Sequence, residues 1–176
     1  MAVRQIRTFG DPVLRTPAAE VREVGDDVRS LMRDMIHTIT DKDGVGGVGL
    51  AAPQIGVLRR VIVWRYEDEL NVIHAGALAN PKLLESRGEV VGEEACLSIP
   101  GLAYPVVRAE WVLVEGRDEL GELKRIEAEG WVARILQHEI DHLDGILFID
   151  RLSPEDRAHA LRKLRQQVLG EPAPAF

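Results

Sequence analysis

The sequence predicts an α+β fold in which a mainly antiparallel sheet surrounds a central helix, with further helices in the N-terminal and C-terminal parts. Short β-branched segments bounded by turn residues cluster between residues 59 and 128, whereas helical periodicity occurs before and after them. Strands and helices do not alternate regularly, which disfavours a parallel α/β arrangement. The chain has 176 residues, no internal repeat and no linker composition, so we expect one domain over residues 1–176.

The first predicted helix covers residues 26–42. Its apolar residues recur every three or four positions, as expected for one buried face of a helix. These residues are Val28, Leu31, Met32, Met35, Ile36 and Ile39. This pattern ends near Gly44, and the small residues of GVGLAAPQIG (47–56) then predict a tight turn into a buried strand at 59–64. Further strands are expected at 82–86, 89–91, 111–115 and 123–128. Asp118 and Gly121 supply a turn between the last two.

Two more helices are predicted after the strands. Residues 131–143 form the central one, because a single helical face carries Trp131, Ile135, His138 and His142. The last helix begins at Ser153, a suitable N-cap, followed by Pro154 in the first turn and by Asp156, which can return the capping bond. Its predicted docking stripe consists of Leu161, Leu164 and Val168. We expect residues 170–176 to be a frayed tail.

The composition is that of a soluble globular protein, and the lack of a targeting pattern makes the cytoplasm the expected compartment. Hydrophobic residues make up 45% and charged residues 29% of the chain, and the net charge of -7 argues against general nucleic-acid binding. The sequence contains neither a signal-peptide pattern nor an apolar run long enough to cross a bilayer, so no membrane partner is expected. Cys96 is the only cysteine, which excludes a disulfide within the chain.

The segment QHEIDHLDGILF (137–148) carries the main chemical signal. His138 and His142 are one helical turn apart with Glu139 beside them, the spacing that binds a zinc-type metal and places a carboxylate where it can act as a base. A catalytic site of this kind needs a third protein ligand. One class of metalloproteases would have a histidine at position 148, where this chain has Phe148.

Two other residues are candidates for the third ligand. Glu155 lies on a later helix, as in thermolysin-like proteases, but its position is one where a helix N-terminus commonly has an acid. Cys96 lies in GEEACLSIPG (92–101), between an acidic pair and a Pro-Gly turn. A lone cysteine is more often a buried apolar residue, yet beside a two-histidine motif that lacks its usual partner a thiolate ligand becomes the better interpretation.

Three segments in order, GVGLAAPQ, EACLS and HEIDH, resemble the signature motifs GxGLAAxQ, EGCLS and HExDH of the peptide deformylases. The resemblance extends to IRTFGDPVLR, NPKLLESRGE, PGLAYPVVRAEWV and the helix after LSP, and so covers nearly the whole chain. One residue departs from the family pattern, because Ala95 replaces the usual glycine of the second motif. This substitution would strain the loop only if the position required a positive φ.

The resemblance implies a metal-dependent hydrolase that removes the formyl group from the initiator methionine of new polypeptides and releases formate. It assigns one divalent metal, Fe(II) in preference to Zn, Ni or Co, to Cys96, His138 and His142. Glu139 would take a proton from the attacking water and pass it to the leaving amine. The amide of Gln54 and the backbone N–H of Leu97 would stabilise charge on the formyl oxygen.

The resemblance also implies how N-formylmethionyl nascent peptides bind. The backbone at Val48 and Gly49 would pair with the extended peptide as an added strand, and Val48 and Ile135 would line an apolar pocket for the methionine side chain. For Ile135, ordinary core packing is nearly as good an interpretation. Arg108 is expected to pair with Glu94 or a neighbouring acid and brace the cysteine loop.

Two rival functions and one possible partner remain open from the sequence. The rivals are a metal-dependent endopeptidase and, given Ala95, a catalytically silent binder of formylated N-termini. The possible partner is the ribosome, which could dock on the last helix because that helix carries Arg157, Arg162, Lys163 and Arg165. A solvated face supported by Glu155 and Asp156 is the simpler interpretation of that helix.

Overall fold

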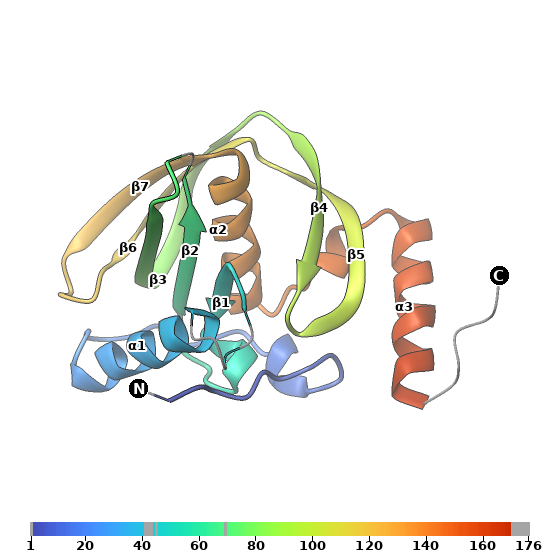
Figure 1. Cartoon of the computed structure of the whole chain (residues 1–176), viewed down its shortest axis with the longest axis horizontal. Coiled ribbons are helices and arrows are strands. Elements are labelled where there is room, and N and C mark those ends of the chain that lie inside the picture. Colours follow the sequence, from blue (N-terminus) through green and yellow to red (C-terminus); the bar gives the residue numbers. More distant parts are fainter. Residues whose placement is uncertain (1, 41–43, 45, 69, 170–176) are drawn as a thin grey trace.

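The computed structural model describes residues 2–40, 44, 46–68 and 70–169, and it confirms the α+β class (Figure 1). The first helix, α1 (Asp26–Thr40), agrees with its prediction up to residue 40, and the expected residues 41 and 42 lie outside the described part. The tail at 170–176, predicted to fray, also lies outside it. In the described chain the topology is antiparallel apart from one isolated parallel bridge between Ala19 and Arg59.

The main sheet has five antiparallel strands in the order β1-β2-β3-β6-β7. Their bounds are β1 Gly49–Ala51, β2 Val61–Glu67, β3 Ile73–Arg87, β6 Trp111–Arg117 and β7 Leu123–Glu129. The strand predicted at 82–86 is therefore only the end of a much longer strand, β3. The predicted turn between β6 and β7 is confirmed, because the N–H of Gly121 donates to the carbonyl oxygen of Asp118 at 3.0 Å.

Two helices pack on opposite faces of this sheet and bury β2 on both sides. Val61 and Val63 belong to the core cluster that contains α1, whereas Ile62 and Trp64 belong to the cluster that contains α2 (Gly130–Leu143). Because successive side chains of a strand point to opposite faces, a strand covered on both faces must be apolar throughout. This arrangement explains the uninterrupted hydrophobic run of β2 and fixes α2 against the sheet.

A separate two-stranded hairpin, formed by β4 (Val90–Cys96) and β5 (Ile99–Arg108), supplies the cysteine. The strand predicted at 89–91 is confirmed for Val90 and Val91 but continues to Cys96, whereas the turn predicted at Pro100 and Gly101 is wrong, because both residues lie in β5. The turn is at Leu97 and Ser98, between the paired residues Cys96 and Ile99. A two-stranded sheet has only edge strands, so β5 tolerates its prolines without losing a central hydrogen-bond ladder.

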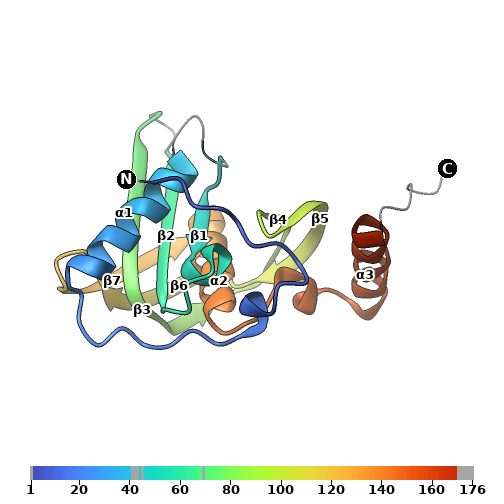
Figure 2. The ribbon, with the colours of Figure 1, turned by 90° about the horizontal axis from the view of Figure 1, so that it is seen from below.

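The last helix, α3 (Pro154–Leu169), stands at the end of the molecule beyond this hairpin, as Figures 1 and 2 agree. The predicted cap is present, because Ser153 Oγ accepts a hydrogen bond from the N–H of Asp156 at 3.1 Å. Leu164 is buried and Leu161 packs against the same cluster, while the side chain of Val168 is outside the described set. Tyr104 adds a polar contact at 3.0 Å between its hydroxyl and Nδ1 of His159.

Three short 3-10 helices complete the described chain, namely η1 (Pro12–Arg15), η2 (Ala52–Ile55) and η3 (Phe148–Arg151). Phe148, the residue in the position of a third histidine, is 1% exposed and belongs to the core. Its ring stacks on His138 with centroids 6.3 Å apart. None of the helices in the described ranges combines the length and the hydrophobicity needed to span a membrane.

The turn after α2 gives a test of how the end of this helix is fixed. Gly145 has φ +73°, and a Cβ there would lie 2.8 Å from the backbone oxygen of Arg15. We expect Gly145→Ala to lower the free energy of unfolding by about 1–3 kcal/mol, since it adds a backbone clash to the strain of positive φ. Gly121→Ala is the matched control, because φ is +80° but the nearest atom is 3.7 Å away. If urea unfolding shows the same decrease in the free energy of unfolding for both variants, the clash with Arg15 is unimportant.

Candidate active site

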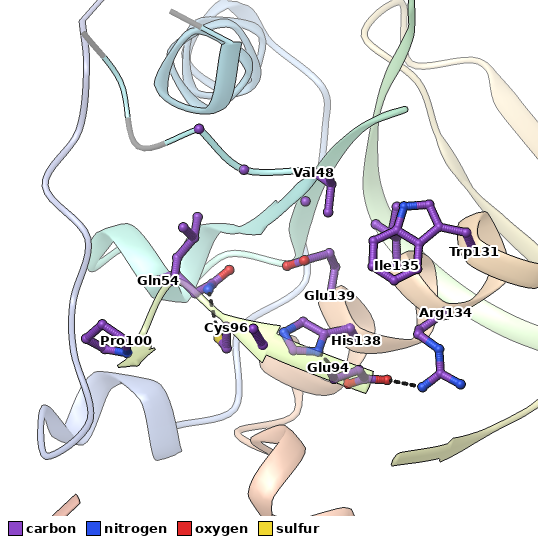
Figure 3. Close-up of a pocket in the computed structure, with 15 residues that line it drawn as sticks. Val48, Gln54, Glu94, Cys96, Pro100, Trp131, Arg134, Ile135, His138 and Glu139 are labelled. Carbon is purple, nitrogen blue, oxygen red and sulfur yellow. Dashed lines mark hydrogen bonds and ion pairs between the residues drawn. The ribbon is translucent and has the colours of Figure 1, made fainter. Parts of the chain in front are cut away.

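Three segments far apart in the sequence meet in one cavity. Helix α2 supplies His138, Glu139 and His142, the β4–β5 hairpin supplies Cys96, and η2 supplies Gln54. Figure 3 shows Gln54 and Cys96 on one side of the cavity, Ile135 and Trp131 on the other, and Glu139 between them. The cavity has a volume of about 380 Å³ and is lined by all the predicted site residues except His142, which is 1% exposed.

Cys96, His138 and His142 form a group that could hold a metal ion. Their ligand atoms all lie within 4.8 Å of one another, and Cys96 Sγ is 3.2 Å from His142 Nε2. One sulfur and two imidazole nitrogens are donors suited to Fe(II), Zn, Ni and Co. The Nδ1 atom of His138 lies 2.9 Å from a carboxylate oxygen of Glu94, which can only accept, so Nε2 of His138 is left available to a metal. The residues therefore fit a metal site.

Glu94 is the buried residue that orients His138. Its carboxylate accepts hydrogen bonds from Arg108 at 2.8 and 3.0 Å and from Arg134 at 2.8 Å, in addition to the contact with His138. The prediction that Arg108 pairs with Glu94 is thus confirmed. Burial alone would raise the pKa of Glu94, but the bonds with His138 and Arg108 outweigh it and hold the pKa well below its ordinary value. Glu94 is therefore a fixed negative charge behind the first histidine.

The surroundings shift the pKa values of the two histidines in opposite directions. Burial acts to lower the pKa of His138, but hydrogen bonds to Cys96 and Glu94 outweigh it and raise the pKa well above its usual value. Burial, assisted by the positive charge of His138, lowers the pKa of His142 well below its usual value. Metal binding at this group competes with the proton on His138, so metal affinity should fall as the pH falls.

Glu139 has the properties of a proton-transfer group. It is 4% exposed, and its Oε2 atom has no hydrogen-bond partner among the described residues. Burial raises its pKa to about 7, close to the value at which a carboxylate both takes and returns a proton efficiently. Gly49 makes room for this carboxylate, because a Cβ on Gly49 would clash with the Oε1 atom of Glu139. The small residue at position 49 is thus required by a close approach.

The amide of Gln54 is held in one orientation. Its Oε1 atom accepts a hydrogen bond of 2.8 Å from the N–H of Ala51, which directs the NH₂ group toward Cys96 Sγ at 3.5 Å and Ser98 Oγ at 3.3 Å. Gln54 is 1% exposed, so this donor is fixed in the wall of the cavity. Leu97 is the first residue of the hairpin turn and also lines the cavity, directly after Cys96.

Ala95, which departs from the family pattern, has an unstrained backbone. It lies in β4 opposite Ala103 and is absent from the residues with positive φ, which in the described chain are Asn71, Asn80 and several glycines. A glycine is therefore unnecessary here, and alanine aims Cys96 without strain. Strain at Ala95 was the argument for a catalytically silent binder, and the structure shows no such strain.

Several residues of the site were missed at the level of sequence. Trp131 lines the cavity and is 53% exposed, whereas the sequence pattern predicts only that it lies on one face of the helix. Arg134 reaches Glu94 and also donates to the carbonyl oxygens of Val90 and Val106 at 2.9 Å each. Asp141 is buried and bound by arginines on the far side of α2. Asp141 could have been noticed in the sequence, because it lies between the two histidines of the HEIDH motif.

The raised pKa of Glu139 predicts a pH dependence of stability in the metal-free protein. The folded-state pKa is about 7 against an ordinary 4.5, so between these values the folded state retains a proton that the unfolded state has lost. Stability must therefore fall as the pH rises through this window, by about 3 kcal/mol. Urea unfolding at about pH 5 and pH 8 should show a smaller fall in Glu139→Gln, which has no proton to lose. Parallel pH profiles for both proteins would contradict this assignment.

Comparison with known proteins agrees with this geometry. A family model described as polypeptide deformylase matches residues 3–158. The chain is 49% identical over 166 residues to a peptide deformylase of Acidothermus cellulolyticus, covering 94% of this chain and 88% of that protein. The crystal structure of a peptide deformylase from Legionella pneumophila superposes with a TM-score of 0.83 at 42% identity, covering 98% of this chain and all of that one.

A second solved structure adds a ligand-bound relative. Peptide deformylase from Ehrlichia chaffeensis, crystallised in complex with actinonin, matches with a TM-score of 0.85 and 35% identity over 95% of this chain and 98% of that chain. The similarity thus extends over the whole described fold, including both sheets and the three helices. This chain belongs to the polypeptide deformylase family.

Proposed function

We propose that the protein hydrolyses the N-formyl group of the initiator methionine on newly made polypeptides and releases formate. Removal of this group is the activity of the family to which the chain belongs. The observation that carries the proposal is the buried carboxylate of Glu139, whose Oε2 atom has no partner among the described residues, in the same cavity as Cys96 and His138 of the possible metal group. Because these nascent chains are made in the cytoplasm, we infer that the protein acts there.

Cys96, His138 and His142 would hold one divalent metal ion. Fe(II) is the ion we propose, with Zn, Ni or Co as alternatives that suit the same donors. When bound, such an ion lowers the pKa of water and polarises a carbonyl oxygen. Glu94 contributes by fixing the ring of His138 through its Nδ1 atom, and Phe148 stacks on the same ring.

Glu139 would act as the general base and then as the general acid. Its carboxylate takes a proton from the attacking water, and the same proton is then given to the nitrogen of the leaving amine. In the metal-free protein, burial raises the pKa of this carboxylate to about 7, so it can take up and release a proton near neutral pH. Its Oε2 atom has no partner among the described residues, and Figure 3 shows the side chain among the residues that line the cavity.

Gln54 and Leu97 would stabilise the negative charge that develops on the formyl oxygen. The Gln54 amide is preorganised by its bond from Ala51, so no reorientation is required during the reaction. The backbone N–H of Leu97 follows the cysteine in the hairpin turn and would supply the second donor. Removing one donor of this type costs about 100-fold to 1,000-fold in turnover in other hydrolases.

The substrate would bind as an extended strand along β1. This strand lies at the edge of the main sheet with β2 as its sheet partner, and Val48 and Gly49 line the cavity at its start. Main-chain pairing at Val48 and Gly49 accepts many sequences because it does not depend on side chains. Val48, which is 43% exposed, and the buried Ile135 would form apolar walls for the methionine side chain.

Formate release from a formyl-Met peptide tests this function. We expect the protein, kept anaerobic with Fe(II), to release formate, and Glu139→Ala to abolish turnover while the metal content stays unchanged. Full turnover in Glu139→Ala would falsify the role of this residue. Cleavage of an internal bond without formate would instead favour an endopeptidase. Saturable binding of the peptide without any reaction would identify a silent binder.

We further propose that α3 docks on the ribosome, from which the substrate emerges. Arg157, Arg162, Lys163 and Arg165 are exposed on this helix in a protein of net charge -7. Changing the last three of these residues together to glutamine should reduce co-sedimentation with ribosomes, because fewer phosphates are neutralised. The matched control changes the exposed cations Arg22, Arg33 and Lys82, which lie outside α3, to glutamine. Unchanged co-sedimentation of the α3 variant would leave the helix as a solvated face.

A further inference from the structure

We propose that Arg151, which lies outside the catalytic cavity, is a positioning residue for the metal centre. Arg151 belongs to η3 and contacts Asp141, the residue that precedes His142 in α2. Through Asp141, Arg108 and Glu94, its guanidinium is connected to the ring of His138. This inference rests on the proposed function, because it concerns the ion that Cys96, His138 and His142 would hold.

The outer half of the connection is a bidentate ion pair. Arg151 donates from Nε to Oδ2 of Asp141 at 2.7 Å and from Nη2 to Oδ1 at 2.5 Å. Oδ2 of Asp141 also accepts from Nη1 of Arg108 at 2.5 Å. Asp141 is 6% exposed, so its charge depends on these two arginines for compensation. Without Arg151, Oδ1 of Asp141 loses the one partner that is described for it.

The inner half transmits the position of Arg108 to His138. Arg108 uses Nη1 for Asp141, and it uses Nε and Nη2 for the two oxygens of Glu94 at 2.8 and 3.0 Å. Glu94 then contacts Nδ1 of His138 at 2.9 Å. The planar guanidinium of Arg108 is thus fixed between two carboxylates, and a shift of one of them moves its bonds to the other. A loss at Asp141 therefore changes the orientation of His138.

The short helix η3 reaches His138 by two routes. Phe148, at its start, stacks on the His138 ring with an interplanar angle of 24°, and Arg151, at its end, acts through the ion pairs. Both contacts come from one four-residue segment that directly follows the loop after α2. Phe148 thus contacts the ring directly, whereas Arg151 acts on it through Asp141, Arg108 and Glu94.

The outer end of this network faces a second cavity. Arg108, Asp141 and Arg151 line a space of about 300 Å³ together with residues of β3 and β5, on a different face of α2 from the catalytic cavity. The side chain of Arg151 is 43% exposed there, whereas that of Arg108 is 3% exposed. Replacing Arg151 therefore removes a charge at the surface without opening the core.

Zinc affinity, measured with Zn²⁺ alone by competition with a chelator, tests the inference without any substrate. We expect Arg151→Met to weaken binding roughly threefold to tenfold, below the 10-fold to 100-fold typical for a residue that contacts a ligand directly. Glu94→Gln gives that larger effect as a reference. Arg151→Lys should restore only part of the affinity, because lysine supplies the charge without the bidentate geometry.

The matched control is Arg59→Met. Arg59 is also a half-exposed arginine, with 45% of its side chain exposed, and it pairs with Asp27 at 2.5 Å, without a described contact to the metal group. Zinc affinity in this control should equal that of the unchanged protein. The Co(II) absorption spectrum should shift in Arg151→Met and stay unchanged in Arg59→Met, because only the former alters the ligand geometry.

The outcomes separate this inference from the proposed function. If Cys96→Ser weakens zinc binding and Arg151→Met leaves both affinity and the Co(II) spectrum unchanged, the positioning role of Arg151 is overturned. If Cys96→Ser leaves zinc binding unchanged, the proposed ligand set is wrong and the inference is overturned with it. An equal loss in Arg151→Met and Arg59→Met would show a general charge effect and would also overturn it.

Discussion

The structure depends on the compensation of a carboxylate that is almost removed from water. Glu94 is 4% exposed, and an isolated buried charge would destabilise the fold by several kcal/mol. Arg108 and Arg134 supply the compensation, and each comes from a different element. The hairpin and helix α2 are therefore held together by the same charges that orient His138. Stability and chemistry share one set of contacts at this point.

The sequence predicted best those elements that depend only on residues close together in the chain, such as amphipathic helices and tight turns. The spacing of apolar residues in α1 and α2 and the turn at Asp118 were sufficient to locate these elements. Strand β5 was missed because Pro100 and Pro105 argue against a strand unless the strand is known to lie at an edge. That knowledge depends on the tertiary structure, in which β5 pairs with β4 and with no other strand of the described fold.

The active site likewise contains contacts that could be predicted from the sequence and contacts that could not. Cys96, His138 and His142 could be suggested from residue type and spacing, and the Arg108–Glu94 pair from the resemblance to the family. The contact of Asp141 with Arg151 could not, because nothing in the local sequence says which of many surface arginines will meet a given aspartate. The backbone at position 95 also required coordinates, since a small residue is compatible with both extended and left-handed conformations.

The two-residue turn of the β4–β5 hairpin has a consequence for metal selectivity. Cys96 ends one strand and Leu97 begins the turn, so the proposed thiolate ligand and the proposed backbone donor are adjacent in the chain. Because the two residues are consecutive and the turn has only two residues, we expect a displacement of the sulfur to displace the N–H of Leu97 as well. An ion of different radius that pulled the sulfur inward would also displace the donor relative to the formyl oxygen. The size of the ion would then be reflected in the turnover rate as well as in the strength of binding.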